Sequence, residues 1–326
     1  MKIQFNITSS DGDLDRYADR ADFLSMLPGF DGVELLCCGE DVRGILPPDK
    51  VVGLHMSSFP YWLDFWRGDT AACLREFGDA ATCRAYYGGD GPEALLGRWR
   101  IDLANAARYG AEYVVFHVND CSAREAMTRV FRHSPEEVID ASCEVLNELF
   151  PADADGPLLL LENLWEPGLT FTDPALTRRL LAGVQYKNKG LMLDTGHLLH
   201  TDLSLRTQAD ALDYIGRMLD AHGDLCRWIR GVHLNQSLTG AYVRRVMAHP
   251  PAPAADWAAR NLQMYEYIFH VDLHRPFTCP GVRALLERIA PDYLTFEFIS
   301  RSRAEHRRLL RRQQQALGIA PGGIAD

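Results

Sequence analysis

Imidazole and carboxylate side chains recur along this sequence directly after short apolar segments. The run Gly190-Leu-Met-Leu leads into Asp194, and His197 follows three residues later. Five other apolar segments end in the same way, on His55, His117, Glu162, His233 and Glu297. Imidazole and carboxylate together suit zinc, manganese, iron or cobalt. Carboxylates without a partner repel one another, and a divalent cation between them removes this electrostatic repulsion. The residue types therefore predict a metal site.

The segments that must position these residues alternate between two patterns. Strand-like apolar segments cover residues 2–7, 30–36, 51–56, 113–118, 158–163, 191–195, 229–234 and 293–299. Apolar residues at helical spacing cover residues 14–27, 93–109, 135–150, 174–181, 205–221, 282–289 and 303–317. Eight alternating units indicate an α/β chain that closes into a single (β/α)8 TIM barrel. The strand ends of such a barrel converge on the face that carries active sites, so we expect the six strand-end positions to meet there.

Composition sets limits on domain number and on partners. The chain has 326 residues, 47% of them hydrophobic, and we expect one domain over residues 1–326. The net charge of −10 argues against broad electrostatic binding to nucleic acid or to anionic membrane. There is no apolar run of membrane-spanning length, and the N-terminus reads as a strand rather than a signal peptide. Eight cysteines without a CxxC pair indicate reduced, packed thiols, so we expect a soluble, cytoplasmic protein.

Two connections, after the third and seventh strands, are long. Residues 57–91 open with the aromatic run from Phe59 to Trp66, which either stacks on a sugar face or a base or packs within a lid. Residues 235–280 contain Pro250-Pro-Ala-Pro253 and a helix expected at 255–268. Long loops in a compact fold are usually functional, so we expect residues 235–280 to act as a lid over the barrel mouth or as a subunit contact.

Further candidate residues have two interpretations each. Asp272 and His274 lie two apart, so in an extended segment both side chains could hold one ion. Glu34, at the end of the second strand, contacts substrate or pairs with a neighbouring cation. Six arginines form either a nucleic-acid patch or the solvated end of the last helix, at positions 301, 303, 307, 308, 311 and 312.

The strand ends resemble the xylose-isomerase-like barrel superfamily, which holds sugar isomerases and epimerases as well as the endonuclease IV group of DNA repair enzymes. The resemblance covers nearly the whole chain and is most specific in Leu193-Asp-Thr-Gly-His197, Gly231-Val-His-Leu-Asn235 and Asp272-Leu-His-Arg-Pro276. It implies that Glu162, Asp194, His233 and Glu297 bind one divalent ion, as in the ketose epimerases. It also matches His55, His117, His197, Asp272 and His274 to the additional ligands with which endonuclease IV binds three metals.

The connection from Asn235 to Val271 is much longer than either group normally shows. The sequence also departs from these relatives in two other places that concern the substrate. Family members usually follow the Asp-x-His element with a turn such as Gly-x-Gly, whereas Phe277-Thr-Cys-Pro280 stands here. The residues after His55 do not resemble the DNA-inserting loop of a repair endonuclease. Both departures leave the nine ligand positions untouched.

We therefore expect a metal-dependent isomerase or epimerase of a sugar or related hydroxy-carbonyl compound. In the family's mechanism Glu162 and Glu297 would take and return a proton while one ion, Mn, Zn, Fe or Co, stabilises an enediolate. The alternatives are a phosphodiester hydrolase with two or three ions on the nine ligands, an iron oxidase in the same cage, and a barrel that binds without catalysis. The acidic charge favours a small carbohydrate-like substrate without nucleic acid or membrane, and a homo-oligomer remains open.

Overall fold

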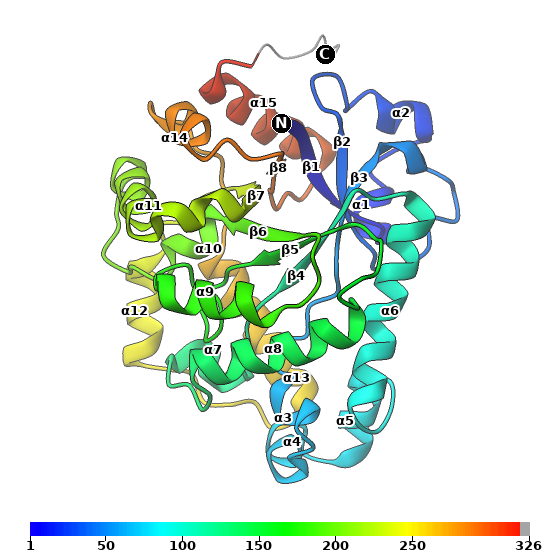
Figure 1. The fold of residues 1–326 in the computed structure, drawn as a ribbon, viewed down its shortest axis with the longest axis vertical. Coiled ribbons are helices and arrows are strands. Elements are labelled where there is room, and N and C mark those ends of the chain that lie inside the picture. Colours follow the sequence, from blue (N-terminus) through cyan, green and yellow to red (C-terminus); the bar gives the residue numbers. More distant parts are fainter. Residues whose placement is uncertain (320–326) are drawn as a thin grey trace.

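Eight parallel strands close into a barrel in sequence order, because β1 pairs with both β2 and β8 (Figure 1). The computed structural model describes residues 1–319. The strands are β1 (Lys2–Thr8), β2 (Gly32–Leu36), β3 (Val51–His55), β4 (Tyr113–His117), β5 (Leu158–Glu162), β6 (Lys189–Asp194), β7 (Ile229–Leu234) and β8 (Tyr293–Phe296). The predicted (β/α)8 barrel is confirmed.

The strands are apolar throughout because both of their faces are buried. In β5, Leu158 and Leu160 belong to the small cluster inside the barrel. Leu159 and Leu161 belong to the larger core that also takes in the apolar faces of the surrounding helices. Since side chains alternate along a strand, Glu162 continues the inward row of Leu158 and Leu160 at the carboxyl end.

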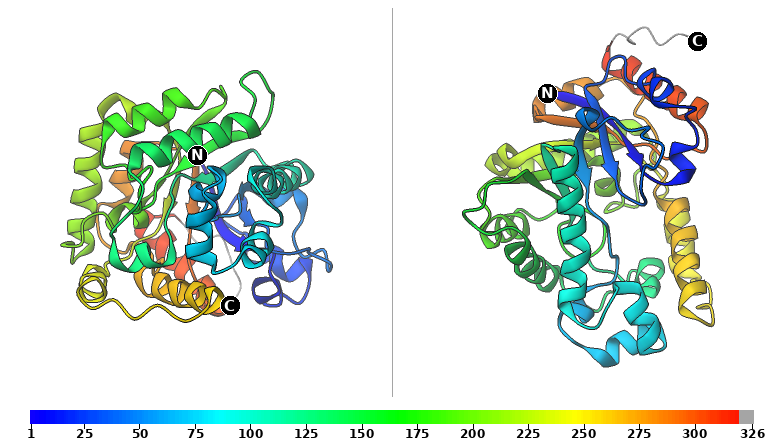
Figure 2. Two further views of the ribbon diagram at one scale, coloured as in Figure 1. Left: turned by 90° about the horizontal axis from the view of Figure 1, so that it is seen from below. Right: turned by 90° about the vertical axis from the view of Figure 1, so that its right-hand side faces the viewer.

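Helices cover the outside of the barrel (Figures 1 and 2). The main ones are α6 (Pro92–Tyr109), α8 (Pro135–Leu149), α9 (Pro174–Gly183), α11 (Gln208–His222), α14 (Val282–Ile289) and α15 (Arg303–Leu317). Short 3-10 helices, η1 (Pro48–Lys50) and η2 (Gly223–Trp228), precede β3 and β7. The start of α8 is fixed by a capping box between Ser134 and Glu137, with Pro135 in the first turn. These helices lie close to their predicted ranges.

The helix predicted over residues 14–27 is wrong as one element. The chain forms two short helices there, α1 (Asp11–Leu14) and α2 (Arg20–Leu24). Asp19, in extended conformation, accepts a hydrogen bond from the Asp22 amide and starts the second helix. A capping aspartate satisfies free amides at a helix start, so it interrupts a helical pattern that apolar spacing alone would continue.

Both long connections fold into helices at the barrel end opposite the chain termini (Figure 1). The connection after β3 forms α3 (Leu63–Trp66), α4 (Thr70–Phe77) and α5 (Ala80–Tyr87). The connection after β7 forms α12 (Gly240–Ala248) and α13 (Trp257–Val271), while α7 (Ala123–Thr128) and α10 (Thr195–Leu199) follow β4 and β6. The Trp257 ring lies 5.3 Å from that of Phe77 and 5.0 Å from that of Tyr86. The two insertions therefore contact each other beside the mouth.

The aromatic run after β3 is built into this cover. Phe59, Tyr61, Trp62 and Phe65 are buried, and Phe59 and Trp62 meet Trp99 of α6 edge-on. These side chains pack within the insertion, as the second of the two interpretations states. All eight cysteines are free, and four of them are buried. Within residues 1–319 no helix combines the length and apolar composition needed to cross a membrane.

Candidate metal centre

The nine predicted ligands gather at the carboxyl ends of β3 to β8 in three groups that each could hold an ion. Within each group the ligand atoms lie within 4.8 Å of one another. The groups are His55, His117 and Glu162; Glu162, Asp194, His233 and Glu297; and His197, Asp272 and His274. Glu162 belongs to two of them, so the first two groups share a carboxylate.

Strand register places these residues together. His117 pairs with Glu162 across β4 and β5, and Asp194 pairs with His233 across β6 and β7. Glu297 follows the last residue of β8, two positions after the inward Thr295. Because each is the last inward position of its strand, all of them point into the mouth.

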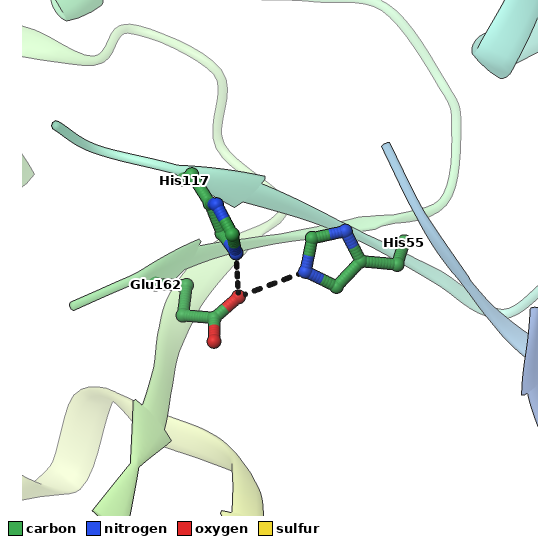
Figure 3. A group of neighbouring side chains, drawn as sticks. All are labelled: His55, His117 and Glu162. Atoms are coloured by element: carbon green, nitrogen blue, oxygen red, sulfur yellow. Dashed lines mark hydrogen bonds and ion pairs between the residues drawn. The ribbon is translucent and has the colours of Figure 1, made fainter. Parts of the chain in front are cut away.

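The two oxygens of Glu162 face different histidines. Figure 3 shows Nε2 of His55 and Nε2 of His117 converging on one oxygen, Oε2, each at 3.1 Å. The other oxygen, Oε1, lies 3.0 Å from Nδ1 of His233 and 3.3 Å from Nδ1 of His197. Glu162 is thus placed to join two ion positions.

A neighbouring group fixes the orientation of each of the five histidines. The Nδ1 atoms of His55, His197 and His274 lie 2.9, 2.9 and 3.1 Å from backbone carbonyls. A carbonyl only accepts, so Nδ1 carries the hydrogen and Nε2 is the bare nitrogen of the neutral ring. Nε2 of His55 faces Glu162, and Nε2 of His197 and His274 faces Asp272. Against the effect of burial, the carboxylates that these Nε2 atoms face raise the pKa of His55, His197 and His274, so without a metal ion they favour a proton on Nε2. Imidazole nitrogens that face carboxylates in this way are a donor set that fits a transition metal ion in place of that proton.

Glu34 holds His233 from inside the barrel. Its carboxylate lies 2.9 Å from Nε2 of His233 and accepts hydrogen bonds from the Tyr113 hydroxyl at 2.5 Å and Thr295 at 3.0 Å. Because Glu34 is 2% exposed, it lies beneath the site rather than in reach of substrate. The structure therefore shows Glu34 paired with the imidazole of His233, the neighbour-pairing interpretation.

Two asparagines that the sequence analysis did not assign position the carboxylates. Asn235 Nδ2 donates to Asp194 Oδ2 at 2.9 Å and to Glu297 Oε2 at 3.2 Å. Asn163 pairs with the Asp194 backbone in both directions. Gly196 leaves room for this arrangement, since a Cβ there would overlap Asn235 Oδ1. Asp194 also caps α10 through the His197 amide, so one carboxylate serves both as a helix cap and as a candidate ligand.

Asp272 and His274 meet, but not through the extended backbone that their spacing suggested. His274 has a φ of +45°, and the Ser237 hydroxyl accepts from the amides of Leu273 and His274 to hold this turn. Nε2 of His274 then lies 2.6 Å from Asp272 Oδ2. The extended conformation expected for this segment is therefore wrong, because a side chain elsewhere in the chain bends it.

His200 is a buried neighbour of this group that the sequence analysis missed. Its Nε2 lies 3.3 Å from Asp272 Oδ1, the oxygen that also takes a hydrogen bond from Ser237, and its ring packs on Trp165 at 4.8 Å. It stands three residues after His197, so i,i+3 spacing on a short helix was the available signal.

The two glutamates of the four-ligand group differ in charge state and in access. Burial raises the pKa of Glu162, but His233, His117 and His197 outweigh it and hold that pKa well below its usual range. Burial also raises the pKa of Glu297, to about 8, against the pull of His233 and His274. The Glu297 side chain is 13% exposed, whereas that of Glu162 is fully buried. Glu297 is therefore the carboxyl group at the surface of the site.

The family model described as the xylose isomerase-like TIM barrel matches residues 27–278. No curated protein matches this chain. A solved D-psicose 3-epimerase, in the presence of D-fructose, is 13% identical with a TM-score of 0.50, over 98% of this chain and 100% of its own. The 3-keto-D-glucoside 4-epimerase YcjR from E. coli is 16% identical with a TM-score of 0.47, over 98% of each chain. An IolI protein with a bound zinc atom is 13% identical with a TM-score of 0.46, over 97% of this chain and 96% of its own. At these identities the likeness concerns the fold alone.

Proposed function

This chain belongs to the xylose isomerase-like TIM barrel family, and on that premise we propose that it is a divalent-metal-dependent isomerase or epimerase of a small carbohydrate-like hydroxy-carbonyl compound. The observation that carries the proposal is the buried group of Glu162, Asp194, His233 and Glu297, whose ligand atoms lie within 4.8 Å of one another at the barrel mouth. Two of these four residues are glutamates, which suit both metal binding and proton transfer.

A divalent ion held by these four residues supplies a Lewis acid for the negative charge that develops on neighbouring substrate oxygens. In this proposal Asp194 and His233 only bind the ion. Both are fully buried, and they are fixed by Asn235 and Glu34, respectively. The fixed orientation limits rearrangement when the ion binds.

Proton transfer falls to the two glutamates. Glu297 is the stronger candidate base, since its side chain is 13% exposed and can reach a substrate, whereas that of Glu162 is fully buried. Glu162 is its proposed partner across the group, and the imidazoles on both of its oxygens keep it ionised. In this arrangement Glu297 removes the proton beside the carbonyl, and either glutamate returns it.

Deuterium exchange tests this reaction class. The metal-loaded protein with a suitable ketose in D₂O should incorporate deuterium at the carbon beside the carbonyl. Glu297→Gln should lower the exchange rate by about 10²–10⁴-fold, because an amide cannot accept that proton. Glu287→Gln, an exposed change on α14, is the matched control. Full exchange in Glu297→Gln would remove this residue from the mechanism.

A second candidate, a phosphodiester hydrolase with several ions, is favoured by the two additional three-residue groups and by the shared Glu162 carboxylate. In that case His55, His117 and His274 hold further ions, which one-metal proton transfer does not need. An iron oxidase in the same cage is a variant of this candidate. Cleavage of an abasic-site duplex, with more than one metal per chain and dependence on these histidines, would overturn the isomerase proposal.

Metal content tests the premise shared by both candidates. Protein purified without chelator should contain at least one manganese, zinc, iron or cobalt ion per chain. His233→Ala should lower this number, because the group of four loses a buried ligand. An unchanged metal stoichiometry in both His233→Ala and Asp194→Ala would contradict the assignment.

A further inference from the structure

A cavity of about 530 Å³ opens beside the metal centre. Its lining includes Phe269, Leu273, Arg275, Ile299, Arg301 and Glu305. Asp272 also lines it, and Asp272 is a member of the third ligand group. The cavity and the candidate metal centre therefore share a wall.

Two arginines in this cavity have no partner for their charge. Among residues 1–319, neither Arg275 nor Arg301 forms a side-chain hydrogen bond or ion pair, and both are exposed. Arg303, two residues further along, is by contrast paired with Asp22 at 2.6 Å. In a chain with a net charge of −10, two unpaired guanidinium groups in one cavity form a local site for an anion.

The carboxylates in the cavity are already engaged. Glu305 Oε2 accepts from the Arg301 amide at 2.9 Å, and Oε1 lies 3.5 Å from Arg308. Asp272 is held by His274 and by the imidazoles of His197 and His200. Both acidic groups therefore already have partners, whereas the two arginines are the side chains of the lining whose charge has no partner among residues 1–319.

The backbone holds both arginines on the segments that carry site residues. Arg275 directly follows His274, and it exchanges two backbone hydrogen bonds with Gln236, at 2.8 and 3.0 Å. Arg301 stands four residues after Glu297, where Glu305 fixes its amide before α15 begins. Both arginines thus line the cavity from anchored segments that also carry site residues, His274 on one and Glu297 on the other.

We propose that this cavity binds the phosphate group of the substrate, so that the reacting compound is a phosphate monoester of a sugar or related hydroxy-carbonyl compound. Guanidinium groups recognise phosphate oxygens by charge-assisted hydrogen bonds, and two of them match a dianion. Phe269 and Ile299, 56% and 42% exposed, supply apolar walls for the carbon skeleton next to it. That this anion is part of a substrate rests on the proposed function.

Calorimetric titration of the metal-loaded protein with inorganic phosphate tests the site without turnover. Phosphate should bind with millimolar affinity, and Arg275→Gln or Arg301→Gln should weaken it by about tenfold each. Arg178→Gln, an exposed change on α9, is the matched control and should leave binding unchanged. Circular dichroism melting confirms that the variants fold. Absence of phosphate binding, or equal binding in wild type and both cavity variants, overturns the proposal.

A second measurement separates this proposal from the reaction class. In the deuterium-exchange assay, kcat/KM for a ketose phosphate should exceed that for the free ketose, and Arg275→Gln should reduce this advantage mainly through KM. A preference for the free ketose overturns the phosphate assignment even when exchange occurs. If the cavity variants lose phosphate binding, the anion site is supported whether or not a ketose exchanges. If no ketose exchanges, that separate result counts against the proposed function.

Discussion

The orientation of His233 depends on a partner outside the ligand groups. That partner is Glu34, which is itself held by Tyr113 and Thr295. Burial lowers the pKa of His233, but Glu34, Glu297 and Glu162 carry it well above its ordinary value. A cation entering the site therefore has to replace a proton that these carboxylates favour.

Glu34→Gln tests this supporting role. The amide keeps the size of the side chain but removes the negative charge behind His233, so metal affinity should fall by about 10–100-fold. Competition with a coloured chelator measures the affinity, and Glu287→Gln serves as the exposed control. A variant with wild-type metal affinity and melting temperature would show that Glu34 only fills the barrel.

At the scale of elements, the junction between β6 and α10 concentrates several functions in a few residues. Asp194 ends the strand, caps the helix through the His197 amide and belongs to the four-ligand group. Gly196 allows Asn235 to approach and hold two carboxylates. The glycine is thus required by packing at the site rather than by its backbone angles.

Gly196→Ala should therefore damage the site more than the fold. The added Cβ displaces Asn235, which releases Asp194 and Glu297, so we expect a lower metal content per chain. Gly97→Ala in α6 is the control, because a Cβ there meets open space and should stabilise the helix by roughly 0.5–1 kcal/mol. Equal metal content in the two variants would contradict this account.

The contact between α15 and β1 predicts a pH dependence of stability. His306 is buried edge-on against Phe5 at 5.2 Å, and burial lowers its pKa to about 4. The unfolded chain binds this proton near pH 6.5 and the folded chain only near pH 4, so stability falls as pH drops through that window. The loss amounts to about 3 kcal/mol.

His306→Phe should remove this part of the acid destabilisation. Urea unfolding at several pH values should give a flatter profile between about pH 6.5 and pH 4 than wild type. His249→Phe, a change of an exposed histidine after α12, should leave the profile unaltered. An identical slope for wild type and His306→Phe would show that burial does not govern this residue.

At the scale of the whole molecule, two insertions from opposite halves of the sequence meet beside the barrel mouth. Trp257 at the start of α13 packs on Phe77 of α4 and Tyr86 of α5, and Arg260 bonds the Glu76 carbonyl at 2.5 Å. We propose that these insertions cover the site or form a subunit contact. Their contact is remote from the strands, so loosening it leaves the barrel pairing intact.

Deleting residues 248–258 removes Trp257 and the link between α12 and α13. We expect weaker substrate binding or a changed oligomeric mass, with the barrel still folded by circular dichroism. Trp257→Ala should act in the same direction, and Leu262→Ala, a 61% exposed change on α13, is the control. Unchanged activity, mass and melting temperature in the deletion would show that the insertion has neither role.

Local patterns in the sequence were sufficient to predict the barrel and its ligand positions. A parallel strand buried on both faces must be apolar, so a polar residue at its end, such as His117, Glu162 or Asp194, is conspicuous. Because side chains alternate between the two faces of a strand, its position also determines the face to which it points. The same logic found Asp272 and His274, although their backbone is turned rather than extended. The structure gathers these side chains at the barrel mouth, because the pattern depends on residues next to one another in the chain.

Only the tertiary structure decided how the site is supported and bounded. Glu34 meets His233 across 199 positions of sequence, and Arg275 and Arg301 share a cavity because two separate loops fold together. Asn235 and His200 likewise gained their roles from contacts made after the barrel closes. Such contacts depend on register and on loop packing between distant segments, and no short-range pattern in the sequence records their energies. The sequence therefore predicted which side chains gather at the mouth but not which residues hold them.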